Sequence, residues 1–234
     1  VPSASRVQSA TLKMIVDKDR ERKAFVPKKY FDFSISLLIK GKEVNAKLVR
    51  INGETVGKNI TDNEQEILDK IPSKISVKSV QKGIKASEPK LPFITSSLIA
   101  TANTKLGFTS AQTTRSLQTL YEGVTINGKH VGLITYIRVD SCRLSPVFVN
   151  GQAKDFIINK YGNEYYHGPR FASRGNEQGA HEAIRPTYLE NTPQKMAQFL
   201  KEPEAKLYKL IYEHTLASLM TPRKYESTNV IFEE

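Results

Sequence analysis

The sequence lacks most of the features that anchor a protein in a membrane, cross-link it or let it hold zinc. No apolar run in its 234 residues is long enough to cross a bilayer. The single cysteine, Cys142, excludes an internal disulfide and cannot build a thiolate zinc site alone. The first residues have neither the basic and apolar regions of a signal peptide nor an initiator Met. We therefore expect a cytoplasmic chain without membrane contact, cut from a longer protein.

Common catalytic signatures are missing too. The segment HEAIR at 181–185 lacks the second histidine of HExxH, and GxSxG, Walker A and GxGxxG do not occur. With four histidines and one cysteine, a zinc site is not expected. Asp17 and Asp19 form a DxD, but residues two apart on a helix point to different sides, which favours a charged helix surface. The prediction is that this chain holds no metal.

What the sequence has in excess is positive charge. Lys and Arg number 35 against 24 Asp and Glu, which gives a net charge of +11. Such an excess favours a polyanionic partner such as nucleic acid, although a generic basic surface has the same composition. Hydrophobic residues make up 39% of the chain, enough for a packed core. Charge alone therefore leaves the partner open.

The first third of the chain is expected to be rich in β-structure. A helix at 3–24 is indicated by the capping-box spacing of Ser5 and Gln8. Residues 30–39 alternate between apolar and polar, which is the pattern of a half-buried strand. The further elements expected here are a strand after the turn at 40–42, a short helix that begins at Thr61, and a strand at 75–82.

The remainder is expected to be mostly helical up to its last strand. A linker at 85–92 precedes it, and the alternating residues 223–232 have no strand partner nearby in sequence. We expect that last strand to return to the first β-rich part, so that a helical part is inserted into it, an α+β organisation. The other expected elements are helices at 96–106, 110–121, 193–201, 204–220 and from Ser145 onward, a tight turn at Asn127–Gly128, a strand in GLITY at 132–136, and a loop at 162–180.

The stretch GLITYIRVDS at 132–141 carries the most suggestive chemistry. On a strand, Tyr136 and Arg138 lie on the same face. A guanidinium beside a phenol stabilises the phenolate and binds phosphate oxygens in a bidentate manner, which suits attack of a tyrosyl oxygen on a phosphodiester. A phenolate also leaves more readily than an alkoxide, so the bond is reversible without added energy. The alternative is a tyrosine that packs with its hydroxyl capped, beside an arginine that is a surface charge.

Further segments, in a fixed order, separate these two interpretations. They are SASRVQS (3–9), PFITSSL (92–98), KLGF (105–108), LYEG (120–123), GLITYIRVDS (132–141), AHEAIRPT (180–187) and MTPRKYEST (220–228). With them the chain closely resembles the type IA DNA topoisomerases, in their bacterial topoisomerase I form, over nearly its whole length. The most specific segments are GLITYIRVDS and AHEAIRPT.

The resemblance implies an enzyme that cuts one DNA strand, holds its 5′ end on a tyrosine, passes another strand through the gap and reseals it. Such an enzyme relaxes negative supercoils without ATP. Tyr136 matches the nucleophile, and Arg138 matches the arginine that contacts the scissile phosphate. His181 matches a histidine of the active-site and DNA-contact network. Arg185 either braces its loop through an ion pair or faces DNA.

The resemblance also implies a DNA contact at the start of the chain. Ser3, Arg6 and Gln8 match a segment that touches single-stranded DNA next to the cleavage site, where a helix start also favours phosphate. Ser5 stands at the family's glycine in that segment, which alters how closely backbone and DNA approach. Val139 replaces a threonine and is expected to face away from Tyr136, with little catalytic effect. The insert at 124–131 resembles a hairpin of some family members.

The family's Toprim domain, with its catalytic glutamate and Mg²⁺ site, has no counterpart in this sequence, and neither do the basic C-terminal modules. The implied domains are the end of a DNA-gripping domain at 1–22, a β-rich arch at 23–90 plus 222–234, and a tyrosine-bearing helical domain at 91–221. The implied partners are DNA and these missing domains, with Mg²⁺ bound by Toprim and none in this chain. We expect weak DNA binding and little or no cleavage by the chain alone.

Two other interpretations stay open at this point. Topoisomerase III and the topoisomerase half of reverse gyrase share the tyrosine and the arginine, although YIRVDS at 136–141 lies closer to the topoisomerase I form. A non-catalytic DNA-binding clamp keeps the basic surface and does not need Tyr136. Either clamp or enzyme would bind DNA less tightly as salt rises, because phosphate contacts release counterions.

Overall fold

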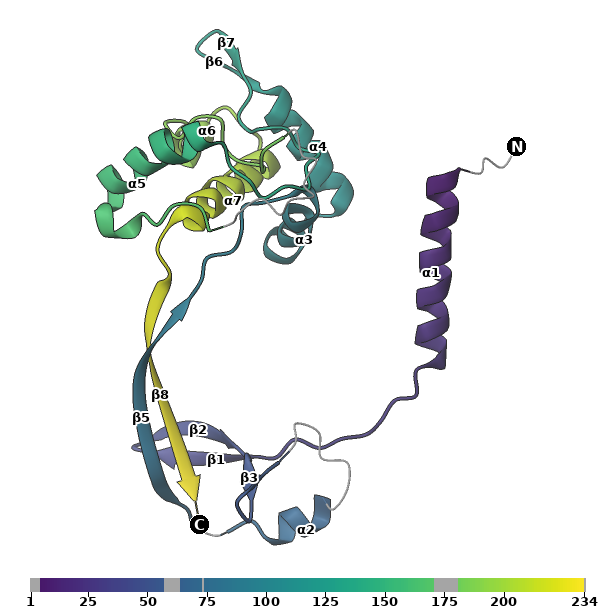
Figure 1. Ribbon diagram of the computed structural model, residues 1–234, viewed down its shortest axis with the longest axis vertical. Helices are drawn as coiled ribbons and strands as arrows, with labels where there is room; N and C mark the ends of the chain where they lie inside the picture. Colours follow the sequence, from purple (N-terminus) through teal and green to yellow (C-terminus); the bar gives the residue numbers. More distant parts are fainter. Residues whose placement is uncertain (1–4, 57–63, 73, 171–180, 234) are drawn as a thin grey trace. The chain divides into compact units, whose positions relative to one another are not determined.

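The computed structural model describes residues 5–56, 64–72, 74–170 and 181–233 (Figure 1). The chain divides into two compact units, one formed by Val1–Ser79 with Ile231–Glu234 and the other by Val80–Val230. Both helices and strands occur, so the mixed α and β content expected from the sequence is confirmed. The first unit holds the N-terminal helix and short β-hairpins, and the second holds most of the helices.

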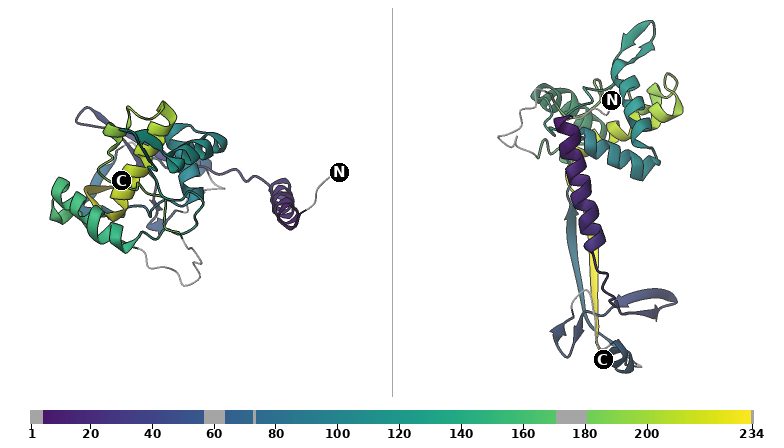
Figure 2. Two further views of the ribbon diagram at one scale, coloured as in Figure 1. Left: turned by 90° about the horizontal axis from the view of Figure 1, so that it is seen from above. Right: turned by 90° about the vertical axis from the view of Figure 1, so that its right-hand side faces the viewer.

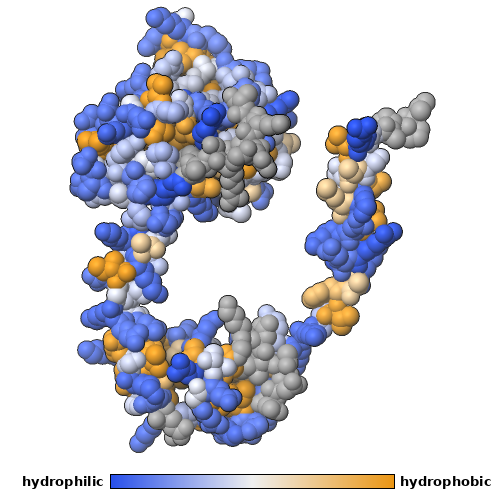
Figure 3. Space-filling view, in the orientation of Figure 1, coloured by the Kyte–Doolittle hydropathy of each residue, from blue (hydrophilic) through white to orange (hydrophobic). Residues whose placement is uncertain are grey.

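The first unit begins with helix α1, Arg6–Ala24. Its start follows from a capping box: the Ser5 hydroxyl accepts the Gln8 N–H at 3.1 Å, and the Gln8 side-chain oxygen accepts the Ser5 N–H at 3.0 Å. None of the residues of α1 is buried, and apolar side chains such as Val7 and Met14 are exposed. Apolar residues are visible on the surface of this helix in Figure 3.

The β-structure of the first unit is a set of two-stranded sheets. Strands β1 (Ser34–Ile39) and β2 (Lys42–Lys47) form an antiparallel hairpin closed at Lys40–Gly41, where both residues have positive φ. The further elements are β3 (Arg50–Ile51), which pairs with β4 (Glu54–Thr55), and the short helix α2 (Glu64–Asp69). Thr61, the cap expected for α2, lies outside the described residues.

Strand β5 (Ser76–Ser87) pairs with the last strand, β8 (Arg223–Glu233). The two strands run side by side in Figure 1 and in the right-hand view of Figure 2. The expectation that the last strand returns to the first β-rich part is therefore confirmed. This pairing joins residues that are far apart in sequence. Most of the helices lie in the chain between the two strands.

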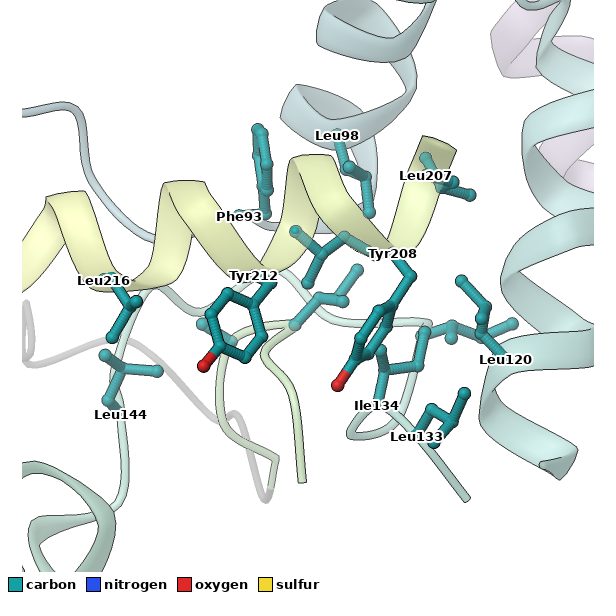
Figure 4. Close-up of a cluster of buried hydrophobic side chains, with 14 of the residues drawn as sticks. Phe93, Leu98, Leu120, Leu133, Ile134, Leu144, Leu207, Tyr208, Tyr212 and Leu216 are labelled. Atoms are coloured by element: carbon teal, nitrogen blue, oxygen red, sulfur yellow. The ribbon is translucent and has the colours of Figure 1, made fainter. Parts of the chain in front are cut away.

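The second unit contains the packed core. Its helices are α3 (Thr95–Leu106), α4 (Ser110–Glu122), α5 (Lys154–Tyr161), α6 (Pro193–Met196) and α7 (Glu202–Leu219), with a π-helical turn at Phe148–Ala153, a 3₁₀ turn at Asn163–Tyr165 and a hairpin of β6 (Val124–Ile126) and β7 (Lys129–Val131). Asn127 and Gly128 close that hairpin with positive φ angles, as the sequence predicts. The buried side of α7 contributes Leu207, Tyr208, Tyr212 and Leu216 to the core drawn in Figure 4.

The expected strand in GLITY is wrong. Within 132–140 the only ladder contact is an isolated bridge between Ile134 and Pro186. The segment contains bends, and its backbone groups bond to three different places instead of to one partner strand: Leu133 N–H reaches Leu120, Thr135 N–H reaches Arg185, and Val139 bonds to Thr95. The apolar, β-prone composition of this segment therefore reflects burial against several elements, not membership of a sheet.

Candidate active site

Tyr136 lies at the surface of the second unit, in a cluster of aromatic rings. Its ring centroid is 4.6 Å from that of His181, at an interplanar angle of 46°, and 5.6 Å from that of Tyr121, at 69°. The Tyr136 side chain is partly buried and packs against the edge of the core. Together with Thr135 and Glu182, these three aromatic residues line an open pocket. Tyr136 and His181, both expected in the active site, are thus brought together.

Hydrogen bonds between two distant segments place His181 beside Tyr136. The Thr135 N–H donates to the Arg185 carbonyl at 2.9 Å, and the Arg185 N–H donates to Thr135 Oγ1 at 3.0 Å, although the two residues are 50 positions apart. The Thr135 hydroxyl donates to the Ala183 carbonyl at 2.8 Å. The GLITY and AHEAIRPT segments are therefore fixed to one another next to the pocket.

The Tyr136 hydroxyl differs from those of the buried tyrosines. Tyr208 and Tyr212 donate their hydroxyls to the Asn191 and Leu189 carbonyls at 2.6 and 2.7 Å, and burial raises the pKa of each. The Tyr166 hydroxyl donates to the Val149 carbonyl at 3.0 Å, and burial raises its pKa as well. Within the described ranges, the Tyr136 hydroxyl has no hydrogen-bond partner. Its phenolic oxygen is not the capped group that a purely structural tyrosine would have.

Arg138 is exposed on the same segment and makes no ion pair with any described residue. Its neighbours Ile137 and Val139 are buried, at 4% and 8% exposure, so they hold the backbone on either side. Val139 is also fixed by three hydrogen bonds to Thr95: its N–H donates to Oγ1 at 2.9 Å, and its carbonyl accepts from the Thr95 N–H and hydroxyl, each at 3.0 Å. A free cation on a rigid backbone can receive a phosphate without first breaking an internal pair.

Arg185 is engaged inside the loop. Its Nε and Nη2 donate to the two carboxylate oxygens of Glu182 at 2.9 and 2.7 Å, and Nη1 donates to the Pro186 carbonyl at 2.8 Å. The guanidinium also lies 4.0 Å from the Phe148 ring centroid. With a side chain only 12% exposed, these contacts fit the loop-bracing alternative. A DNA contact by Arg185 stays a prediction.

The Glu182 carboxylate connects this loop to the backbone just before the helical segment that begins at Pro146, because Oε2 also accepts the Ser145 N–H at 2.8 Å. Sequence reasoning did not single out Glu182, Tyr121 or Thr135 as residues of the site. Their contribution depends on contacts between distant segments, so a single sequence offers little to find them. For Tyr121 the available signal was its place in LYEG, just before a glycine and the hairpin that leads to GLITY.

Most of the other residues expected to contact DNA stand at the start of α1. Ser5, Arg6 and Gln8 are exposed there, and they belong to the first compact unit. Arg6 makes no ion pair with a described residue. Ser3 lies outside the described residues. A helix start that presents backbone N–H groups together with a free arginine has the composition of an anion-binding end.

The donor groups near Tyr136 do not fit a metal site. Among the described residues, no group of three or more His, Cys, Asp or Glu side chains is arranged to hold an ion. The one carboxylate that lines the pocket, Glu182, is already bound to Arg185. A divalent cation such as Mg²⁺ needs several oxygen ligands, so we derive no step through a metal bound to these residues. Among all the residues that the structure describes, none of the helices has the length and hydropathy needed to cross a membrane.

Comparison with known families agrees with the sequence motifs. A model of the DNA topoisomerase family matches residues 1–234. The chain therefore belongs to the DNA topoisomerase family. Its resemblance to the bacterial topoisomerase I form, of type IA, is confirmed by relatives that carry the name DNA topoisomerase 1.

The protein of that name from Thermotoga maritima is 37% identical over 231 residues, which cover 98% of this chain and 35% of the relative. Those from Treponema pallidum and Campylobacter jejuni are 37% and 38% identical, over 96% and 97% of this chain and 31% and 33% of theirs. The solved structure of full-length topoisomerase I from T. maritima matches with a TM-score of 0.75 at 35% identity, over 99% of this chain and 36% of that one. The chain thus spans about a third of the length of these relatives.

Proposed function

We propose that this chain carries the DNA-cleavage site of a type IA topoisomerase and that Tyr136 is its nucleophile. The observation that carries the proposal is the uncapped Tyr136 hydroxyl beside an open pocket lined by His181. A reactive group must be reachable by its substrate, and the buried tyrosines of the same unit fail that requirement because carbonyl groups occupy their hydroxyls.

In the proposed reaction the phenolic oxygen of Tyr136 attacks a phosphorus of the DNA backbone. An ester bond forms between that phosphorus and the tyrosine, and the bond from phosphorus to the 3′ oxygen breaks. The phenol gives up its proton, and the departing 3′ oxygen takes one up. Nothing is oxidised or reduced, and one phosphoester replaces another, so the reverse attack by the 3′ hydroxyl reseals the strand without an external energy source.

The surrounding residues have distinct roles in this proposal. Arg138 binds the oxygens of the scissile phosphate and offsets the charge that develops during attack. His181, whose ring contacts that of Tyr136, donates a hydrogen bond to the scissile phosphate or to the DNA next to it. Ser5, Arg6 and Gln8 at the start of α1 hold the sugar-phosphate backbone of the adjacent single strand, and Ser3 is proposed to contact the same strand. Arg185 supports the loop that carries His181, so it acts on DNA mainly through the position of that loop.

The complete enzyme needs more than this chain. We infer that domains 1–22, 23–90 with 222–234, and 91–221 act with a Toprim domain and C-terminal modules that lie outside it, on chromosomal DNA in the cytoplasm. When bound to Toprim, Mg²⁺ would supply positive charge near the cleaved strand. Topoisomerase III and reverse gyrase remain the near alternatives, and the motif YIRVDS favours topoisomerase I. Decatenation by the complete enzyme, measured against relaxation, separates these activities.

The test is a covalent adduct between the complete enzyme and a short single-stranded oligonucleotide, trapped by denaturation. Wild type is expected to form a 5′-linked adduct, and Tyr136→Phe is expected to form none, because phenylalanine keeps the ring but has no oxygen to donate. Tyr165→Phe, an exposed tyrosine outside the pocket, is the matched control and should form adduct normally. An adduct that persists in Tyr136→Phe excludes Tyr136 as the nucleophile.

A non-catalytic clamp is the second candidate, favoured by the net charge of +11. It predicts salt-sensitive DNA binding with no adduct under any condition, in the complete protein as well. The enzyme reading predicts that this chain alone binds DNA weakly and does not relax it, and that adding a separately made Toprim fragment restores relaxation. Robust relaxation by this chain alone would contradict that prediction.

A further inference from the structure

One aromatic side chain of the pocket has no role in the chemistry above. Tyr121 stands in the last turn of α4 and is 39% exposed. Its ring lies nearly perpendicular to that of Tyr136, at 69° with centroids 5.6 Å apart, which is the favourable edge-to-face arrangement of two aromatic rings. Its hydroxyl has no hydrogen-bond partner among the residues that the structure describes. Tyr121 therefore meets Tyr136 through its ring.

The backbone around Tyr121 fixes that contact. The Leu133 N–H donates to the Leu120 carbonyl at 2.9 Å, which joins the end of α4 to the segment that carries Tyr136. A Cβ at Gly132 would lie 2.9 Å from the Tyr121 carbonyl oxygen, and a Cβ at Gly123 would lie 2.3 Å from the Val131 carbonyl oxygen. Only glycine permits both approaches. The β6–β7 hairpin thus begins and ends in close backbone contacts, and the second of these brings the segment that carries Tyr136 against the Tyr121 backbone.

We propose that Tyr121 is a positioning residue for the nucleophile. Its ring packs against the Tyr136 ring and limits the rotation that would turn the phenolic oxygen away from the pocket. The inference rests on the proposed function, in which Tyr136 attacks a phosphorus. In such a reaction the attacking oxygen must be in line with the leaving oxygen, and a displacement of about 1 Å can cost on the order of 100-fold in rate. The ring of Tyr121, and not its hydroxyl, supplies this restraint.

The test compares three variants of the complete enzyme in single turnover with a single-stranded oligonucleotide. Tyr121→Phe keeps the ring and is expected to form adduct within about twofold of the wild-type rate. Tyr121→Leu and Tyr121→Ala remove the ring and are expected to slow adduct formation by about 10- to 100-fold. The dissociation constant of the oligonucleotide, measured separately, should change by less than about threefold, because a positioning role acts on the chemical step. Tyr165→Leu serves as the control for loss of an exposed tyrosine.

Four results have distinct meanings. Adduct formation at the wild-type rate in Tyr121→Leu overturns the proposal. An equal loss in Tyr121→Phe and Tyr121→Leu also overturns it, because the hydroxyl would then be the active group. A loss that is matched by weaker oligonucleotide binding assigns Tyr121 to DNA contact instead. Absence of a Tyr136-dependent adduct in the wild type rejects the proposed function, and this is read from the wild-type and Tyr136→Phe reactions alone.

A measurement on the chain itself does not depend on activity or on the folding of a variant. Nuclear Overhauser spectra with labelled tyrosine rings should show cross-peaks between Tyr121 and Tyr136 and between Tyr136 and His181, because these centroids lie 5.6 and 4.6 Å apart. The Tyr136 ring should also flip more slowly than that of the exposed Tyr165. Missing Tyr121–Tyr136 cross-peaks in the folded wild-type chain would contradict the positioning role.

Discussion

The two compact units of this chain differ in the interactions that stabilise each of them internally. Every residue of the buried hydrophobic core belongs to Val80–Val230, whereas none of the described residues of the other unit is buried. Fully buried side chains such as Leu98, Leu120 and Ile211 have 0% exposure in the packed unit. In the other unit, Leu38 and Val7 are 79% and 75% exposed. The packed unit also contains Tyr136 and its pocket.

The difference teaches where local rules suffice and where a core is needed. Helix α1 and the hairpins of the first unit depend on a capping box, turn geometry and exposed ion pairs such as Lys13–Asp17, each of which contributes little alone. An active site that must hold a side chain within a fraction of an ångström requires rigid surroundings, and the packed unit supplies them. Local opening should accordingly be easier in the first unit than in the second.

The largest effect is expected from a cavity in the packed core. Leu98→Ala removes a side chain of 0% exposure and should lower the free energy of unfolding by about 2–5 kcal/mol, through lost burial and an unfilled space. The matched change Leu38→Ala, at 79% exposure in strand β1, should stay within about 0.5 kcal/mol. Urea unfolding followed by circular dichroism measures both. Equal losses of unfolding free energy at the two positions would contradict the difference in packing between the two units.

The next effect concerns ion pairs of unequal burial. Arg185→Met leaves the Glu182 carboxylate without its bidentate partner, and both side chains are largely shielded, at 12% and 22% exposure. We expect a loss of roughly 2–4 kcal/mol in the free energy of unfolding. Lys13→Met breaks the exposed pair with Asp17, at 77% and 44% exposure, and should cost less than about 0.5 kcal/mol. An Arg185 variant as stable as wild type would show that the Arg185–Glu182 ion pair does not stabilise the loop.

The same chemical change can be made at two helix starts. Ser5 caps α1 and Thr109 caps α4, each by accepting the N–H of the residue three positions on. Replacing either by Ala should cost about 1 kcal/mol of helix stability. Hydrogen exchange should register Ser5→Ala only in the amides of α1, whereas Thr109→Ala should lower protection throughout the packed unit. Loss of protection throughout the chain in Ser5→Ala would mean that α1 is not a locally opening element.

The smallest effect is a pH dependence centred on His214. Burial lowers its pKa below the ordinary value of 6.5, with Lys105 and Lys90 acting in the same direction and the hydrogen bond to the Leu91 carbonyl opposing them. Because the unfolded chain takes up the proton first, this stability is present above about pH 6.5 and is lost as the pH falls through the folded pKa. His214→Gln should flatten stability between about pH 5 and 7 in urea titrations. If the unfolding free energy of His214→Gln changed with pH as steeply as that of wild type, other groups than His214 would cause the pH dependence.

Much of the secondary structure followed from local pattern and caps. The helix expected at 3–24 begins at its predicted cap, and the strand expected at 223–232 is Arg223–Glu233 with its distant partner β5. The strand predicted in GLITY was wrong because an apolar, β-prone composition also suits a segment that is buried against several elements. In the residues that follow it, Ile137 and Val139 are buried while Arg138 and Asp140 are exposed, but no continuous partner strand is present in the described chain.

The candidate site was predictable only in part. The motif residues Tyr136 and His181 do meet, and their motifs identified the family before any contact was known. Tyr121 and Glu182 could not be predicted, because each acts through a contact set by tertiary folding. The roles of Arg138, Arg185, Ser3, Ser5, Arg6 and Gln8 toward DNA remain predictions.

The most direct measurement of the central claim locates the DNA on the chain. The adduct formed by the complete enzyme is digested with trypsin and nuclease, and the peptides are sequenced by mass spectrometry. Cleavage after Lys129 and Arg138 yields the peptide HVGLITYIR, residues 130–138, in which Tyr136 is the single tyrosine. The account predicts a nucleotide remnant on Tyr136 of that peptide. A remnant on any other residue, with this peptide recovered unmodified, would contradict it.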